Sequence, residues 1–234
     1  MLHAGIARRT FGRFSGARPS SDPNFASVNL LVPGDPLVSG VSPDVSPLAA
    51  GSRGVFVNGN SVTGGYITRD TGNVIYTQDG VGGGIAMPFP AKYTFDIAFR
   101  VPDVAGGGCL FDMRPPSTDP GGMVCSIINS GLTFYDVTTA LKATVTNVFT
   151  NNTRHLISIA RFDAATTRIF ADGVLVATFA DASNYAAQAN LFLLNTSYNT
   201  AQLAIGSQVQ QIRSTLGVCR YTANFTPSLP FPRS

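Results

Sequence analysis

Thr167–Phe179 read TRIFADGVLVATF and carry the strongest signal for the fold. Both sides of Asp172-Gly173 are rich in β-branched and aromatic residues that partly alternate with polar ones, as is typical of strands. A two-residue Asp-Gly link between two such runs is the sequence of a type I′ hairpin. We therefore predict that the two halves of this stretch pair as antiparallel strands.

Similar runs extend from this hairpin in both directions. Asn129-Ser130-Gly131 indicates a second, looser hairpin, and one short helix or turn is expected near Asn184–Gln188. Residues 32–52, rich in Pro, Gly and Ser, predict an irregular crossing. Many short strands with almost no helix are typical of a sandwich or barrel. The predicted strands are Gly54–Asn58, Asn73–Thr77, Gly84–Met87, Tyr93–Val101, Cys109–Met113, Met123–Ile128, Leu132–Asp136, Ala143–Val148, His155–Phe162, Thr167–Ala171, Val174–Phe179, Leu191–Leu194, Ala201–Ile205, Val209–Ile212 and Gly217–Tyr221.

The composition is poor in charge. Charged residues make up 12% of the 234 residues, every acidic residue is aspartate, and only Lys92 and Lys142 are lysine. The scarcity of Glu and Lys, which favour exposed helices, agrees with a β protein. Such a surface either meets partners or is covered by neutral polar side chains, and both interpretations stay open. A net charge of +3 does not indicate nucleic-acid binding across the chain.

The cysteines and the apolar runs exclude several classes of protein. Cys109, Cys125 and Cys219 are odd in number and have no close-spaced pair, so neither a disulfide framework nor a zinc site is expected. We predict three buried free thiols. No run is long enough for a membrane helix, and the first residues lack the apolar stretch of a secretory signal. They are similar in composition to a mitochondrial presequence.

Residues 1–21 are predicted to form a basic arm, and residues 22–234 a single β domain. The arm has no acidic residue and too little apolar surface to order by itself, so we expect it to bind a partner. Its guanidinium groups suit acidic or stacked contacts, and its aromatic side chains suit anchoring. The partner-binding residues are predicted to be Arg8, Arg9, Phe11, Arg13, Phe14 and Arg18.

The chain lacks the residue patterns of hydrolytic enzymes. Glycoside hydrolysis needs paired carboxyl groups, and most aspartates here lie at positions typical of turns. His3 and His155 have no neighbouring Ser or Cys motif, so a catalytic triad is not expected. Residues 80–84 are glycine-rich but lack the Lys-Ser/Thr of a phosphate loop. We therefore expect no enzyme activity, no catalytic residue and no cofactor.

Glycan binding is the remaining possibility for a small-molecule site. Sites on sandwiches often combine an aromatic platform with Asn, Asp and Gly from loops, and the NTSYN region has that composition. Ordinary loop residues would give the same pattern, so both interpretations stay open. The candidate glycan-binding residues are Asp79, Tyr185, Asn195, Tyr198 and Asn199.

Several stretches resemble one known superfamily. His155–Arg161 leads to the Asp-Gly hairpin as in laminin-G-like domains of the concanavalin A-like lectin/glucanase superfamily, and Tyr93–Arg100 (YTFDIAFR) matches its middle portion. The ending GVCRYTANFTPSLPFP (217–232) and the opening DPNFASVNLLVPGD (22–35) are similar to those of tailed-bacteriophage and prophage structural proteins with this fold. The resemblance covers residues 22–232.

This resemblance implies an all-β, two-sheet antiparallel jelly-roll sandwich of concanavalin A-like type with an extended N-terminal arm. The first and last strands would lie side by side, and Pro227, Pro230 and Pro232 would end the last strand and protect its edge. The implied function is that of a virion structural protein, a capsid-decorating or cement protein held by its arm. The alternative is a tail-tip or fibre adhesin for host-surface glycans.

The implied partners are other virion proteins, further copies of the chain and, for the adhesin, a host glycan; no membrane or nucleic acid is expected. Some relatives bind calcium with acidic residues just before the ending, where this chain has Gln210 and Gln211. Because Ca²⁺ prefers carboxylate ligands, we expect no metal site.

Overall fold

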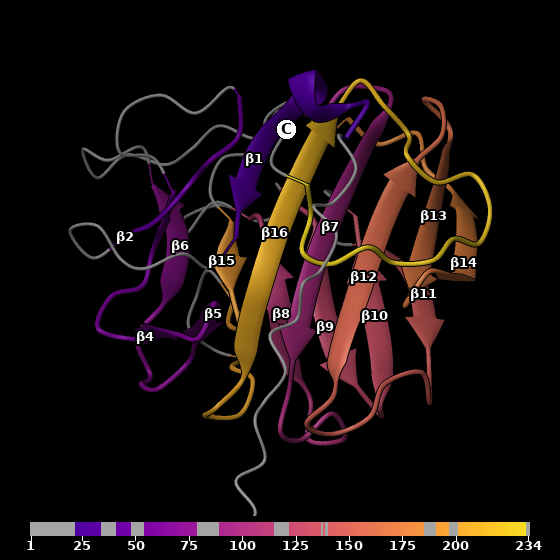
Figure 1. Cartoon of the computed structure of the whole chain (residues 1–234). Coiled ribbons are helices and arrows are strands. Elements are labelled where there is room, and N and C mark those ends of the chain that lie inside the picture. Colours follow the sequence, from indigo (N-terminus) through magenta and orange to yellow (C-terminus); the bar gives the residue numbers. More distant parts are fainter. Residues whose placement is uncertain are drawn as a thin grey trace, which may run out of the picture.

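The computed structural model describes residues 22–33, 41–47, 54–78, 89–114, 122–136, 138, 140–184, 191–196 and 201–232. These residues form two antiparallel sheets that stack face to face (Figure 1), and they include one turn of 3-10 helix, η1 (Phe25–Ser27), but no α-helix. The predicted all-β, two-sheet sandwich is therefore confirmed.

The sheet nearer the viewer in Figure 1, here called the front sheet, contains the longest strands. β16 is central to it: its first residues pair with β5 and its last residues with β1, while β7 lies along its other side. In spatial order the sheet contains β14 (Val174–Ala180), β13 (Thr166–Ala171), β12 (Arg154–Arg161), β7 (Tyr93–Arg100), β16 (Gln208–Leu216), β5 (Tyr66–Thr68) and β4 (Ser61–Thr63), with β1 (Val28–Val32) beside β16.

The back sheet has shorter strands. In spatial order it contains β11 (Leu141–Val145), β10 (Gly131–Tyr135), β9 (Val124–Ile128), β8 (Gly108–Asp112), β15 (Phe192–Leu193), β6 (Ile75–Gln78), β3 (Gly54–Phe56) and β2 (Val41–Pro43). The main core lies between the sheets, where β7 contributes Tyr93, Phe95, Ile97 and Phe99. Each large buried side chain of this kind contributes roughly 1.5–3 kcal/mol through removal from water.

Both predicted hairpins are present. Asp172 and Gly173 have φ angles of 49° and 81° between β13 and β14, as a type I′ turn requires. Asn129 and Ser130 turn at φ angles of 50° and 56°, so the second hairpin is a tight two-residue turn. Gly131 belongs to β10, where a Cβ atom would lie 1.9 Å from the Val145 carbonyl oxygen.

The first and last strands lie side by side, as predicted: β1 pairs antiparallel with β16, with Leu31 opposite Arg213. The prediction for the three prolines is wrong, because β16 ends at Leu216 and they lie beyond it. Residues 217–232 leave the strand, turn along β13 and return across the outer face of the front sheet (Figure 1). We call this segment the C-terminal strap.

Other local predictions are also corrected. Residues 217–221 belong to the strap, and residues 201–205 contribute a single bridge, Gln202 to Cys109, and no strand. β2 lies within the stretch predicted to be irregular, and β4 and β5 were missed. Residues 84–87 and 185–188, predicted as a strand and a helical turn, lie outside the described residues.

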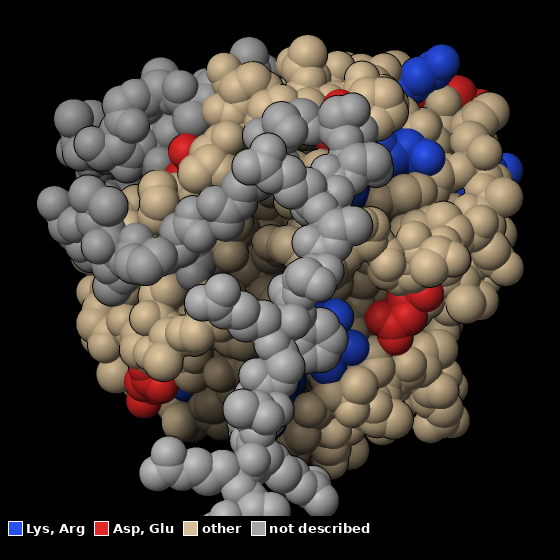
Figure 2. Space-filling model, viewed as in Figure 1, with Lys and Arg blue, Asp and Glu red and all other residues tan. Residues whose placement is uncertain are grey.

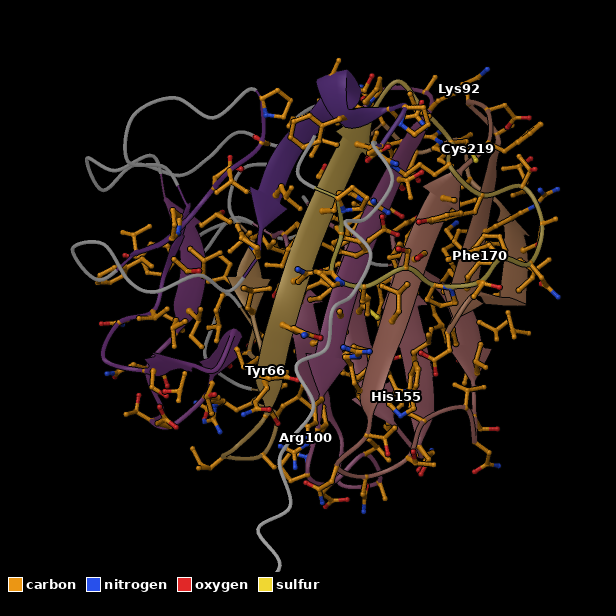
Figure 3. All side chains as sticks on the ribbon, in the orientation of Figure 1. Tyr66, Lys92, Arg100, His155, Phe170 and Cys219 are labelled. Carbon is orange, nitrogen blue, oxygen red and sulfur yellow. The ribbon has the colours of Figure 1, made fainter. Side chains whose placement is uncertain are left out.

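All three cysteines are free thiols, as predicted, but they differ in burial. Cys109 and Cys125 are buried, whereas Cys219 is only half-buried because it lies in the strap, at the upper edge of the front sheet in Figure 3. Burial raises the pKa of each thiol, which keeps the reactive thiolate scarce.

Candidate functional site

The strap covers an apolar patch on the outer face of the front sheet. Alternation along β7 and β12 turns Ala98 and Leu156 outward, where they pack with Val28, Leu31 and Phe231. Phe225 and Leu229 of the strap pack against the same cluster. This outer core explains why β12 is buried on both faces after its first residue.

The Asp-Gly hairpin holds the middle of the strap. The Gly173 carbonyl oxygen accepts a hydrogen bond from the Phe225 amide at 2.9 Å, and the Asn224 side chain accepts one from the Leu175 amide at 2.8 Å. A Cβ atom on Gly173 would lie 2.0 Å from the Phe225 carbonyl oxygen. The glycine therefore serves both the turn and the close approach of the strap.

Aromatic rings fix the outward bend of the strap. The rings of Tyr221 and Phe225 stack with their centroids 3.6 Å apart, and both meet the ring of Phe170 edge-on. Phe170 lies on β13 at the right of the front sheet in Figure 3. The Arg168 guanidinium donates to the Thr222 carbonyl oxygen, which holds the same bend.

Above the outer core, a buried charge network joins both ends of the domain. Arg213 donates to Asp96 at 2.7 and 2.9 Å and to the Tyr221 hydroxyl at 2.7 Å. Arg220 donates to Asp22 at 2.8 Å, and Arg213 lies 3.6 Å from the same carboxylate. Two carboxylates and two guanidinium groups balance in charge, and together they hold Asp22 against β16 and the start of the strap.

The same network determines ionisation. Burial alone would raise the pKa of Asp22. The hydrogen bond from Arg220 and the positive charges of Arg220 and Arg213 together outweigh this effect, so the pKa lies below its usual range. Asp22 is thus ionised at neutral pH. Burial likewise raises the pKa of Tyr221, which stays a neutral phenol. A cavity of about 220 Å³ opens beside these groups and the strap.

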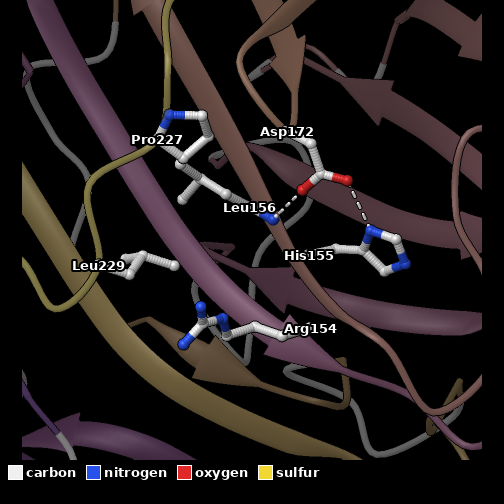
Figure 4. A pocket seen from close by; sticks show the side chains of 6 residues that line it. All are labelled: Arg154, His155, Leu156, Asp172, Pro227 and Leu229. Carbon is white, nitrogen blue, oxygen red and sulfur yellow. Dashed lines mark hydrogen bonds and ion pairs between the residues drawn. The ribbon is translucent and has the colours of Figure 1, made fainter. Parts of the chain in front are cut away.

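Below the outer core lies a second cleft, of about 180 Å³ (Figure 4). β12 contributes Arg154, His155 and Leu156, the hairpin turn contributes Asp172, and the strap contributes Pro227 and Leu229. We call this space the lower cleft. It combines a cation, a carboxylate and an apolar wall within one small concavity.

His155 and Asp172 form the rigid side of the lower cleft. The imidazole Nδ1 lies 2.7 Å from Asp172 Oδ2, and Nε2 accepts from the Thr150 amide at 2.9 Å. These partners assign the neutral ring the Nδ1–H tautomer. Asp172 Oδ1 accepts from the Leu156 amide at 2.7 Å, so the Asp-Gly turn is tied to β12.

A row of polar side chains continues from the lower cleft across the outer face. Arg154 lies directly opposite Arg100 on β7, and Arg100 lies opposite Gln208 on β16. Arg100 donates to Gln208 Oε1 at 3.2 Å, and Arg154 donates to Gln210 Oε1 at 3.3 Å. Figure 3 places Arg100 and His155 at the lower end of the front sheet.

The sequence predicted different binding residues. Asn195 is 1% exposed and its side-chain oxygen accepts a hydrogen bond from the Thr196 amide, and its predicted glycan contact stays a prediction. Asp79, Tyr185, Tyr198 and Asn199 lie outside the described residues, as do all six arm residues. The lower cleft was missed because its members come from β12, the Asp-Gly turn and the strap, which are far apart in sequence and meet only in the folded chain.

No cluster of three or more His, Cys, Asp or Glu side chains that could hold a metal ion occurs among the described residues. Gln211, one of the two glutamines considered as a possible calcium position, accepts a hydrogen bond from the Phe231 amide at 2.7 Å through its side-chain oxygen. In the part of the chain that the structure describes, no helix is long and apolar enough to span a bilayer. Figure 2 shows a mostly neutral face with charges in small separate groups.

Comparison with solved structures finds the same β-sandwich in toxin receptor-binding domains. The receptor binding domain of botulinum neurotoxin D superposes with a TM-score of 0.59 and 9% identity, covering 86% of this chain and 50% of that one. The ligand binding domain of botulinum neurotoxin serotype D in complex with N-acetylneuraminic acid gives 0.57 and 8%, covering 86% and 48%.

A third structure comes from work on the cell entry of botulinum neurotoxin type C, which depends on interaction with two ganglioside molecules. It gives a TM-score of 0.55 and 10% identity, covering 82% of this chain and 48% of that one. The chain therefore spans about half the length of these proteins. No protein-family profile and no curated protein matches it. At this low identity the likeness shows the fold alone, which is a β-sandwich like those of the receptor-binding domains.

Proposed function

We propose that this chain is a non-catalytic recognition module that binds glycans on the outer face of its front sheet. The observation that supports this most is the strap, which borders two clefts that each contain fixed polar groups. The sandwich is also shared with receptor-binding domains, one of which was solved with N-acetylneuraminic acid. Concave sites with a few fixed polar groups are typical ligand sites.

The chemistry of the clefts favours binding over hydrolysis. A glycosidase needs one carboxyl group with a raised pKa as the acid and a second as base or nucleophile. Asp22 lines the cavity of about 220 Å³ beside the charge network. Its pKa is lowered and it is held by Arg220, so it cannot serve as the acid. Asp172, in the lower cleft, is the only carboxylate lining that space among the described residues.

A glycan array tests this proposal. The full chain should bind a restricted set of glycans reproducibly, without releasing any cleaved product. A chain with intact β-type circular dichroism that binds no glycan on a broad array contradicts the proposal. Turnover of a bound glycan, lost on replacing one aspartate by asparagine, contradicts its non-catalytic part.

A second candidate is a virion structural protein, either a decorating protein anchored by residues 1–21 or a tail component that carries the adhesin. It rests on the resemblance of the ending at 217–232 to those of tailed-phage structural proteins, which spans the whole strap. Arg8, Arg9, Arg13 and Arg18 would engage neighbouring subunits, and further copies of the chain are proposed partners. Gold-labelled antibody against the chain, imaged on particles, should mark the capsid or the tail; unlabelled particles contradict this role.

A further inference from the structure

We infer that the lower cleft and the adjoining Arg100 form a subsite for a sugar that carries a carboxylate. This inference rests on the proposed glycan-binding function and specifies its ligand. Arg100 and Arg154 face each other across the ladder between β7 and β12. Like charges directly opposite each other destabilise a sheet, so the sandwich carries this pair at a cost.

Neither guanidinium group is neutralised within the described residues. Arg100 donates to the Asn152 carbonyl oxygen at 3.0 Å, to the Asn152 side chain at 3.1 Å and to Gln208. Arg154 donates to Gln210. All these acceptors are neutral oxygens, and no ion pair of either arginine occurs in this part of the chain. These contacts orient Arg100, and they leave the charges of both cations available to an anion.

The pair is accessible and preorganised. Arg154 is exposed and Arg100 is half-buried, so a ligand can reach both from solvent. Arg100 uses Nε and both terminal nitrogens in its contacts, which orients the planar fork before a ligand arrives. Preorganised guanidinium groups lose little entropy on binding and suit the geometry of a carboxylate.

The other wall of the lower cleft selects a sugar acid over a simple polyanion. Asp172 is 44% exposed in its side chain and presents carboxylate oxygens to the cleft, where they can accept from hydroxyl groups. Leu156, Pro227 and Leu229 supply an apolar surface beside it, which suits the C–H face of a pyranose ring (Figure 4). A polyanion without hydroxyl donors would be repelled by Asp172.

Titration calorimetry on the full chain tests the inference with matched probes. Sialyllactose and tri-galacturonic acid are compared with their carboxyl methyl esters, which keep the rings and remove the charge. At least one acid should bind about tenfold or more tightly than its ester, as the loss of charged hydrogen bonds implies. Arg154→Gln, or Arg100→Gln with Arg154→Gln, should abolish that difference.

Lys92→Gln is the control, because it removes one positive charge at the opposite end of the front sheet (Figure 3). It should leave the preference intact, and circular dichroism and melting should show that every variant is folded. The inference is overturned if acid and ester bind alike, if the arginine variants keep the preference, or if poly-aspartate binds as tightly as the sugar acid. Glycan binding on the array without any preference for the acid over its ester overturns this inference alone, whereas absence of all glycan binding overturns the proposed function as well.

Discussion

Gly173 meets two separate requirements at one position. Its φ angle of 81° belongs to the left-handed region that the type I′ turn needs, and the strap passes so close that a Cβ atom would lie 2.0 Å from a carbonyl oxygen. Gly217, at the start of the strap, has a φ angle of 72° but nothing within 4 Å of a built Cβ. Substitutions at the two glycines can therefore distinguish the cost of backbone strain from the cost of a steric clash.

We predict that Gly173→Ala destabilises the chain well beyond Gly217→Ala. Each alanine carries a left-handed backbone cost of about 1 kcal/mol or more. Only Gly173→Ala also forces the strap to move, which should bring the total to about 3 kcal/mol. Urea denaturation of both variants measures the difference, and equal losses would show that the close approach to Phe225 is unimportant.

A second residue-scale prediction concerns acid stability. The pKa of Asp22 is lower in the folded chain than its ordinary value of 3.8, so its ion pair stabilises the fold above that value and is lost as pH falls through the folded pKa. Asp22→Asn should therefore lower the melting temperature at neutral pH. The gap from the wild type should narrow below about pH 4. A gap that stays constant across that range contradicts this account.

At the scale of elements, the strap acts as an outer layer of the sandwich. Phe231, 2% exposed, packs in the outer core, with the Arg213 guanidinium 4.1 Å from its ring centroid. Replacing a buried Phe by Ala typically costs about 3–5 kcal/mol. We predict that Phe231→Ala lowers the free energy of unfolding by about 3 kcal/mol, at the lower end of this range, because the outer core is only one strap thick.

Phe162→Ala provides the matched control, because Phe162 is 42% exposed and should lose under about 1 kcal/mol. Binding of a hydrophobic dye reports the same event, since a released strap uncovers Leu156 and Ala98. If Phe231→Ala is no less stable than Phe162→Ala, the strap is only loosely attached and does not define the clefts.

The sequence predicts elements where the local pattern is strong. The runs that became β7, β12, β13 and β14 were recognised because their apolar periodicity extends over many residues. β2, β4 and β5 contain three residues each, lie among Gly, Pro, Ser and Thr residues, and were missed. The strap was misread in part as a strand, because its aromatic and apolar residues serve an outer core that only tertiary packing creates.

The candidate site was harder to predict for the same reason. Arg100 and Arg154 are 54 residues apart in sequence and become neighbours only through the pairing of β7 with β12. The Asp-Gly turn was recognised as a hairpin, yet its additional roles as partner of His155 and support of the strap depend on segments far along the chain. Local propensity carries no information about such contacts.

At the scale of the whole molecule, residues 22–232 contain both cores and the charge network that joins their ends. We therefore predict that deleting residues 1–21 leaves a folded sandwich whose melting temperature is nearly unchanged. If the arm anchors the chain to a particle, the same deletion abolishes incorporation. A truncated chain that fails to fold would place part of the sandwich core in residues 1–21.

The central claim is that glycans bind on the outer face of the front sheet, beside the strap. Hydrogen exchange of the full chain, with and without the glycan that binds most strongly on the array, tests it most directly. A ligand at a hundred times its Kd stabilises the bound state by about 2.7 kcal/mol, enough to slow exchange visibly. We predict slower exchange at 150–156, 208–210 and 224–230. Protection confined to the back sheet, or to the opposite end of the sandwich, would contradict the claim.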